Sequence, residues 1–223
     1  MTRPEEDTNT LRALRGLAHE DASVRLRAAL AVGTHPHPGL VGGLVERCAV
    51  EPEFPVREML TWALTRHDAE ETLPLLLDEV RAERAQARSQ ALHTLSKIGD
   101  RRAWPAITPA LLADADEEVA RSAWRAAVVL VPEGEEPALA VVLAAQLGRG
   151  GPGTQLSLSR ALIALGEAVL PLLGAAATAP DPRVRTHALA TERLWRDPDA
   201  GFESAIEEAK RAAVFGEGRQ EGR

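Results

Sequence analysis

A short motif recurs about every 32 residues along this chain, and this repeat limits the fold more than any other feature. Each copy opens on an acidic or polar residue, reaches an apolar residue three places later, and in most copies continues with arginine. We call the apolar residues the anchors; they are Val24, Val56, Ala87, Val119, Leu156 and Val184. The fifth copy is displaced, and the glycine-rich segment 148–153 before it indicates a loop insertion. A period of this length is typical of stacked repeats.

Both halves of each repeat have the spacing of helices, and no segment shows the sustained alternation of a strand. The anchor segment comes first and a second apolar segment follows it. Pro74, Pro105 and Pro137 each lie 18 residues after an anchor, and proline is favoured in the first turn of a helix. The sequence therefore predicts six helix-turn-helix units, each an anchor helix followed by a proline-opened helix. One helix near residues 7–18 precedes them and would cap the stack.

The repeated motif also identifies a family by resemblance. A Leu-rich helix followed by Asp-x-x-Val-Arg-x-x-Ala-Ala-x-Ala-Leu runs from Leu17 to Leu30, and a close copy runs from Asp181 to Leu189. This pattern resembles the HEAT repeat, in particular the short HEAT-like type named after phycobilisome lyases. The resemblance implies an all-α fold, a right-handed α-α superhelix of about six helix-turn-helix repeats with an N-terminal capping helix. We expect residues 1–9 to be a disordered extension, 10–213 the solenoid, and 214–223 a disordered tail.

Composition narrows the class of partner and the compartment. The net charge is −7 and only 3% of residues are aromatic, which disfavours binding to phosphate backbones or stacking on bases. The single cysteine, Cys48, excludes an internal disulfide and a multi-cysteine metal site, and we expect it to be buried. The longest apolar run, 138–145, is too short to span a bilayer, and the acidic N-terminus is unlike a secretory signal. We therefore expect a cytoplasmic protein that binds no membrane.

The residues that enzymes of this repeat class would need are missing from the pattern. A di-iron hydroxylase built on HEAT-like repeats would need several His-Glu pairs in matching repeats, and only His19-Glu20 occurs. His35-Pro-His37 has a metal-like spacing but lies among prolines and glycines, which favours a turn with two solvated imidazoles. No nucleophile elbow, P-loop or paired-carboxylate motif is present. We expect a chain that is not an enzyme and holds no metal or cofactor.

Arginine recurs close after the anchor in five of the six repeats. The five residues are Arg25, Arg57, Arg88, Arg121 and Arg185. Such a row has the chemistry to bind phosphates or carboxylates of a ligand. Alternatively, each arginine pairs with an acid that opens its own or a neighbouring repeat, since guanidinium suits bidentate carboxylate pairing. The available acids are Asp21, Glu53, Asp116 and Asp181. HEAT-like repeats have such an arginine ladder, so the resemblance favours the structural role.

A second set of residues points to a partner. In a HEAT-type stack the second helix of each repeat lines the concave side, as the resemblance implies. Here the proline-opened helices carry apolar residues where a polar surface is expected, and 136–147 is apolar nearly all round. We assign partner binding to Leu75, Asp78, Ala106, Ala138, Val141 and Leu172. By helical phase the apolar members face away from Leu76, Ile107 and Leu139, the expected core. If the phase differs, they contact neighbouring repeats instead.

These observations favour a non-enzymatic scaffold that binds a partner protein or peptide in an apolar concave groove. A homodimer is left open as one form of that partnership. The same repeat class leaves two alternatives. A HEAT-like DNA glycosylase would use a basic, Trp-rich face, and the chain has four tryptophans that leave this alternative open: Trp62, Trp104, Trp124 and Trp195. Each of them is nevertheless expected to pack in the core or between repeats. A bilin lyase-like subunit has the right repeat type but no residue that indicates a pigment.

Overall fold

The computed structural model describes residues 3–199 and 201–217, and over these residues it contains α-helices and short 3-10 helices only. The chain divides into two compact units, each considered by itself. Unit 1 is Met1–Thr108 with Glu118–Leu130, and unit 2 is Pro109–Glu117 with Val131–Arg223. No helix in the described part of the chain has the length and apolar character needed to span a membrane.

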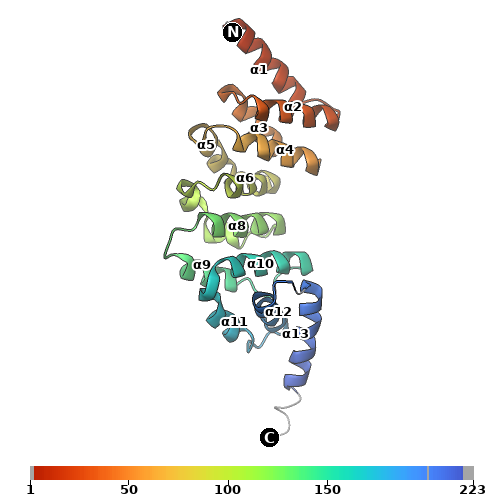
Figure 1. Ribbon diagram of the computed structural model, residues 1–223, viewed down its shortest axis with the longest axis vertical. Helices are drawn as coiled ribbons and strands as arrows, with labels where there is room; N and C mark the ends of the chain where they lie inside the picture. The colour runs from red at the N-terminus through yellow and green to blue at the C-terminus, as the bar shows by residue number, and fades with distance from the viewer. Residues whose placement is uncertain (1–2, 200, 218–223) are drawn as a thin grey trace. The chain divides into compact units, whose positions relative to one another are not determined.

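The helices follow one another with short connections, and their order can be traced by colour in Figure 1. The helices of unit 1 are α1 (Arg3–Leu17), α2 (Ala22–Thr34), η1 (Pro38–Leu40), α3 (Val41–Cys48), α4 (Phe54–Thr65), α5 (Ala69–Glu79), α6 (Ala85–Ile98), η2 (Arg101–Ala106) and, after its first residue, α8 (Glu117–Leu130). Those of unit 2 are α7 (Pro109–Leu112), α9 (Glu136–Ala144), α10 (Pro152–Ala164), η3 (Gly166–Val169), α11 (Leu170–Ala176), α12 (Pro182–Arg196) and α13 (Phe202–Glu217).

Side-chain caps explain where several helices begin. Asp21 accepts a hydrogen bond from the Ser23 N–H at the start of α2, and Asp68 accepts one from the Glu70 N–H at the start of α5. Each satisfies a backbone donor that the first helical turn leaves free. The cap at Asp68 also changes a prediction, because α5 begins at Ala69 and Pro74 lies inside the helix rather than opening it. Pro137 does occupy the first turn of α9, as predicted.

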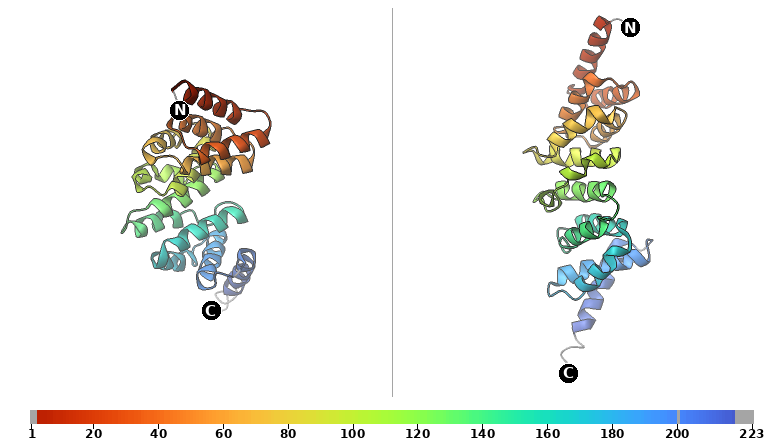
Figure 2. Two further views of the ribbon diagram at one scale, coloured as in Figure 1. Left: turned by 45° about the horizontal axis from the view of Figure 1, so that its top comes forward. Right: turned by 90° about the vertical axis from the view of Figure 1, so that its left-hand side faces the viewer.

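The helices pack in pairs, but each anchor helix pairs with the helix before it rather than, as had been predicted, with the helix after it. In unit 1, α1 packs on α2, α3 on α4 and α5 on α6; in unit 2, α11 packs on α12. The anchor helix is therefore the second member of its pair, α1 belongs to the first pair, and α13 follows the last pair. Successive anchor helices also lie side by side, α2 with α4 and α4 with α6, as Figure 2 shows within unit 1 from two further directions.

The buried residues confirm the predicted helical phase. Leu76, Ile107 and Leu139 are all buried, as expected of core positions. The anchor helices α4, α6 and α8 each bury the anchor and the residues four, five, seven and eight places later, whereas the anchors Val24 of α2 and Val184 of α12 are half-buried. In α4 these are Val56, Leu60, Thr61, Ala63 and Leu64, and in α8 they are Val119, Ala123, Trp124, Ala126 and Ala127. Cys48 is buried as well, and this burial raises the pKa of its thiol to about 12.

The fifth anchor is Thr154 and not Leu156. In α10 the same buried spacing starts at Thr154, whereas Leu156 is only half-buried. The Thr154 hydroxyl lies 2.5 Å from Glu117 Oε2, so this polar anchor is satisfied by a hydrogen bond within unit 2. An anchor chosen for being apolar passes over a threonine, and this accounts for two residues of the displacement of the fifth repeat.

Small hydroxyl side chains join neighbouring anchor helices inside the core. Thr61 of α4 and Thr94 of α6 are 3.4 Å apart between hydroxyl oxygens, and Ser159 of α10 and Thr191 of α12 are 2.7 Å apart. Both pairs use the residue five places after one anchor and the residue seven places after the next. Because buried hydroxyls need partners, each pair favours one register of the two helices.

The structure differs from the expectation at both ends of the solenoid. Helix α1 begins at Arg3, within the segment 1–9 that was expected to be disordered, and α13 continues to Glu217, beyond the expected boundary at 213. Residues 1–2 and 218–223 lie outside the described residues, so the prediction for them stays untested.

Candidate binding surface

Four of the five ladder arginines hold the loop that leads into their own helix. Arg57 Nη1 donates to the carbonyl oxygens of Glu51 and Pro52, at 3.0 and 2.7 Å. Arg25, Arg88 and Arg185 each bond the same two carbonyls, six and five residues earlier, at 2.7–2.9 Å. Arg121 differs, because its Nη1 lies 2.6 Å from Glu118 Oε1, one turn earlier on α8. The shared partners are carbonyl oxygens of the loop, two to four residues after the end of the preceding helix, and the arginine satisfies these backbone acceptors.

The opening acids have other partners than the predicted ones. Asp21 and Asp181 accept hydrogen bonds from the N–H groups two residues ahead, at 2.7 and 2.8 Å, and so cap α2 and α12. The carboxylate that Arg25 binds is Glu51, and Glu53 takes part only through its N–H, which donates to Glu51 Oε1 at 3.0 Å. The predicted pairing of Arg25 with Asp21 or Glu53 is therefore wrong in its partner. A short aspartate at the helix start reaches the backbone donors before it reaches the arginine.

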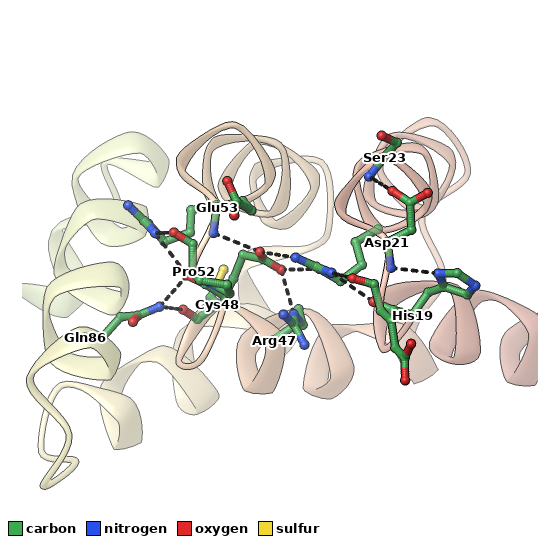
Figure 3. A network of polar contacts seen from close by, with 12 residues as sticks. His19, Asp21, Ser23, Arg47, Cys48, Pro52, Glu53 and Gln86 are labelled. Atoms are coloured by element: carbon green, nitrogen blue, oxygen red, sulfur yellow. Dashed lines mark hydrogen bonds and ion pairs between the residues drawn. The ribbon is translucent and has the colours of Figure 1, made fainter.

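Glu51 is bonded to several residues of a polar network, in which Arg47, Glu53 and Gln86 are labelled in Figure 3. Its side chain is fully buried; Oε2 lies 2.7 Å from both Arg25 Nε and Arg47 Nε. Burial raises the pKa of Glu51, but the hydrogen bonds from Arg25, the Glu53 N–H and Arg47 outweigh it and hold the pKa at about 2. Gln86 of α6 donates to the Glu51 carbonyl oxygen at 2.7 Å. Every acceptor in this network is occupied from within unit 1, so the network ties helices together.

The residues assigned to partner binding fall into both units. Leu75, Asp78 and Ala106 lie in unit 1, and Ala138, Val141 and Leu172 lie in unit 2. Leu75 is 38% exposed and Val141 57% exposed, whereas Ala106 and Leu172 are half-buried. Within either unit the set therefore contains one large exposed apolar side chain. In the observed frame these residues stand on the first helices of the pairs, while the resemblance gives the concave side to the second helices.

The second helices of unit 1 carry a different set of side chains, of which Leu30, Trp62 and Arg125 are exposed and His93 is half-buried. Six places after the anchor, successive helices carry Leu30, Trp62, His93 and Arg125, and we call these four residues the position-six face. Leu30 is 46% exposed and Trp62 38% exposed. The Trp62 ring lies against Gly33 of α2, so closely that a Cβ on that glycine would fall 2.3 Å from Trp62 Cζ3. The face is thus apolar over α2 and α4 and polar over α6 and α8.

The polar half of the position-six face combines the guanidinium of Arg125 with a histidine that is paired with a carboxylate. His93 Nε2 lies 3.2 Å from Glu58 Oε1. Burial lowers the pKa of His93; Glu58 opposes this, and the charges of Arg125 and Lys97 add to it. Arg125 donates to Ser122 Oγ at 3.1 Å, and neither it nor Lys97 has a carboxylate within 4 Å among the described residues. Burial, and then repulsion from Arg121, lower the pKa of Arg125.

In unit 2 the corresponding surface of α12 is covered. Ala190, six places after its anchor, and Leu194 are buried in one apolar cluster with Phe202, Ala205 and Ala209 of α13. In Figure 1, α13 lies beside α12. The position-six surface of an anchor helix is therefore one on which another helix packs in this protein.

The two histidines with a metal-like spacing, His35 and His37, lie in a turn. His35 and His37 are exposed in the turn between α2 and η1, where His37 Nδ1 accepts from the Gly39 N–H at 3.2 Å. The His37 N–H in turn donates to His67 Nε2 at 3.3 Å. His35 and His37 line part of a cavity of about 480 Å³ with Thr10 and Val32. In the described part of the chain, no group of three or more His, Cys, Asp or Glu residues has a geometry suited to a metal ion.

Comparison with known proteins identifies the repeat. Residues 41–128 match the family model described as HEAT repeats. A search of curated proteins found no match. Similar solved structures include an engineered protein, at 16% identity and a TM-score of 0.45, covering 91% of this chain and 98% of that one. Human deoxyhypusine hydroxylase in complex with glycerol is similar at 18% identity and a TM-score of 0.47, covering 93% and 95%. Neither similarity bears on function.

The family match agrees with the observed frame of the helix pairs. It begins at Val41, the first residue of α3, and ends within α8, so it contains α3–α8 with each anchor helix second. It does not separate the phycobilisome lyase type from other HEAT repeats, and that subtype stays a prediction. The matched segment, residues 41–128, therefore consists of HEAT repeats.

Proposed function

We propose that this protein is a non-enzymatic interaction module of the cytoplasm that binds another protein or peptide through the position-six face of unit 1. HEAT repeats generally act as protein-interaction scaffolds, and the family match supports that general role. The single thiol, Cys48, is buried and unpaired, as suits a reducing compartment.

The exposed pair Leu30 and Trp62 carries the proposal. The two residues stand at equivalent places on α2 and α4, which pack side by side, and large exposed apolar side chains on a surface flanked by charge are typical of interaction sites. Tryptophan and arginine dominate the energetics of many interfaces, and this face holds Trp62 and Arg125. The face also belongs to the second helices of the pairs, the side on which a HEAT-type stack presents its concave surface.

Two titratable groups with strongly shifted pKa values, Glu51 and His187, support a structural role rather than a catalytic one. Glu51 is enclosed by Arg25 and Arg47. His187 is held between the Gly148 N–H and the Gln155 carbonyl oxygen at 3.0 and 2.9 Å. Shifted groups at an enzyme active site face a cleft, whereas these two hold chain segments together.

The test compares two exposed leucines of unit 1. Leu30→Asp places a charge on the position-six face, and Leu11→Asp places the same charge on α1, where Leu11 is 55% exposed. Tagged wild type and both variants are used to capture proteins from host cytosol, with circular dichroism to check folding. We expect a stoichiometric partner that is retained by Leu11→Asp and lost by Leu30→Asp. A partner lost only by a Val141→Asp variant would move the site to α9, and no partner on any of them would contradict the scaffold.

A further inference from the structure

The packing of α13 shows what kind of segment fits a position-six surface. Its apolar residues Phe202, Ala205, Ile206 and Ala209 have the spacing i, i+3, i+4 and i+7, the stripe of an amphipathic helix. The first, second and fourth are buried against Ala190 and Leu194 of α12, and Ile206 packs against the same cluster. Leu156 and Ile163 of α10 also pack against it. A helix with an apolar stripe thus covers this surface in unit 2.

The same surface in unit 1 has apolar residues with no helix on them. Leu30 and Trp62 are exposed there, and Leu26, one turn before Leu30, is half-buried. Neighbouring helices pack about 8–10 Å apart, so the row from α2 to α8 extends about 30 Å. At about 1.5 Å per residue, a helix of about 20 residues would span it.

The cations at the other end of the row define the charge of the occupant. Lys97 and Arg125 have no carboxylate within 4 Å among the described residues. Arg125 is close enough to Arg121 to be repelled by it. Glu118 and Glu58, which are also near, offset part of that repulsion. A carboxylate placed here would relieve that repulsion and form charge-assisted hydrogen bonds with the guanidinium. A phosphate backbone would gain the same contacts but would have to approach a chain of net charge −7.

Building on the proposed function, we propose that the position-six face of unit 1 binds an amphipathic helix of a partner protein. The apolar stripe of that helix lies on Leu30 and Trp62, and acidic residues near one of its ends bind Lys97 and Arg125. The partner is therefore an acidic helical segment. It is recognised by its apolar stripe and by negative charges that lie at a fixed distance from that stripe along the helix.

The probe is a display library of 20-residue peptides with fixed apolar residues at i, i+3, i+4 and i+7 and random residues elsewhere. It is selected on the full-length chain. We expect enriched peptides to carry Asp or Glu toward one end and to bind at least tenfold more weakly when those acids become Asn or Gln. Arg125→Glu and Lys97→Glu should each weaken binding about tenfold, while Arg101→Glu, which reverses an exposed charge on η2, should change it less than twofold.

Each result decides between the inference and the proposed function. Peptides that are lost with Leu30→Asp but show no preference for acids would overturn the acidic partner and leave the scaffold standing. Failure to select any peptide sensitive to Leu30→Asp would count against both. A parallel arm measures a fluorescein-labelled 20-base-pair DNA duplex at the same ionic strength. Binding of that duplex, lost in Arg125→Glu, would mean that the cations serve phosphates and would overturn the inference.

Discussion

Arg25 and Glu51 form a two-point ion pair between two buried side chains, with Nε–Oε2 and Nη2–Oε1 distances of 2.7 Å each. The pair joins α2 to the loop between α3 and α4, and Arg47 adds a third bond from α3. Each of these buried charges is stabilised by its partner. Removal of one partner is strongly destabilising, because it leaves the other charge buried and unpaired.

Glu51→Gln should lower the free energy of unfolding by about 3 kcal/mol at pH 7. The amide removes the charge that balances Arg25 and Arg47 while keeping the shape of the side chain. Because the pKa of Glu51 is lowered to about 2, its contribution is complete above about pH 4.5 and is lost as the pH falls toward 2. Urea unfolding at several pH values checks this. Glu70→Gln, which removes an exposed pair with Arg102, is the control and should change stability little; equal stability of the two variants would contradict the prediction.

His187 should make unit 2 sensitive to mild acid. Its Nδ1 accepts from the Gly148 N–H, so Nε2 carries the proton and donates to the Gln155 carbonyl oxygen. Burial lowers the pKa of His187 to about 4, so the unfolded chain takes up the proton first as the pH falls. Stability should decline by up to about 3 kcal/mol between pH 6.5 and 4. In His187→Gln we expect lower stability but a flatter pH profile; an unchanged slope would show that another group titrates.

Arg185→Ala should act on stability. The substitution removes two hydrogen bonds, to the carbonyl oxygens of Ala179 and Pro180, and should cost about 1–3 kcal/mol. Arg183→Ala is the matched control, since this exposed arginine lies two residues away and its N–H, rather than its side chain, binds Asp181. Thermal melts of both variants test the prediction, which would fail if the melting temperature of Arg185→Ala were that of wild type. Arg25→Ala should act in the same way.

Substitution by aspartate should affect the stability of the protein very differently at two residues of α9. Val141 is 57% exposed and Leu139 only 4%, although they lie two residues apart. We expect Val141→Asp to change the free energy of unfolding by about 0.5 kcal/mol or less. Leu139→Asp should cost several kcal/mol, since it buries a charge without a partner. Circular dichroism during urea unfolding distinguishes them. A large loss of helicity in Val141→Asp, or in the corresponding Leu75→Asp of α5, would show that these residues are core.

Gly33→Ala should separate α2 from α4. The added Cβ would lie 2.3 Å from Trp62 Cζ3 and 2.9 Å from the Ala63 Cα, which is backbone and cannot move away alone. We expect a loss of about 1–3 kcal/mol and a shift in the tryptophan fluorescence. Gly42→Ala in α3 is the control, because its Cβ meets nothing within 4 Å and alanine favours a helix. A Gly33→Ala protein as stable as Gly42→Ala would contradict the close approach of Trp62.

The sequence was a good guide to the phase of each helix and a poor guide to its neighbours. Apolar spacing places Leu76 and Leu139 in the core because burial follows the helical period. The sequence did not predict whether an anchor helix pairs with the helix before it or with the helix after it. The loops on both sides of an anchor helix are short, and apolar spacing does not indicate which neighbouring helix packs on it. Thr154 was missed as an anchor because its burial depends on a hydrogen bond to Glu117.

The candidate site was harder to predict for a related reason. Leu30, Trp62, His93 and Arg125 occupy equivalent places but share no chemistry, so no repeated residue type marks them. The carbonyl partners of the arginines are equally hidden, because a backbone acceptor has no signature in the sequence. Glu51 occurs once, outside the repeated motif, and only its contact with Arg25 shows what it does.

The Glu51 network also bears on how a stack of this kind loses its order. In a linear array each repeat contacts only its neighbours, so the terminal repeat is secured from one side and tends to fray first. Glu51 receives donors from α2, from α3 and from the start of α4, and thereby adds an electrostatic bond between the first pair and the second. Fraying from the amino end must break this bond before the first pair can leave, so the two pairs melt as one cooperative block.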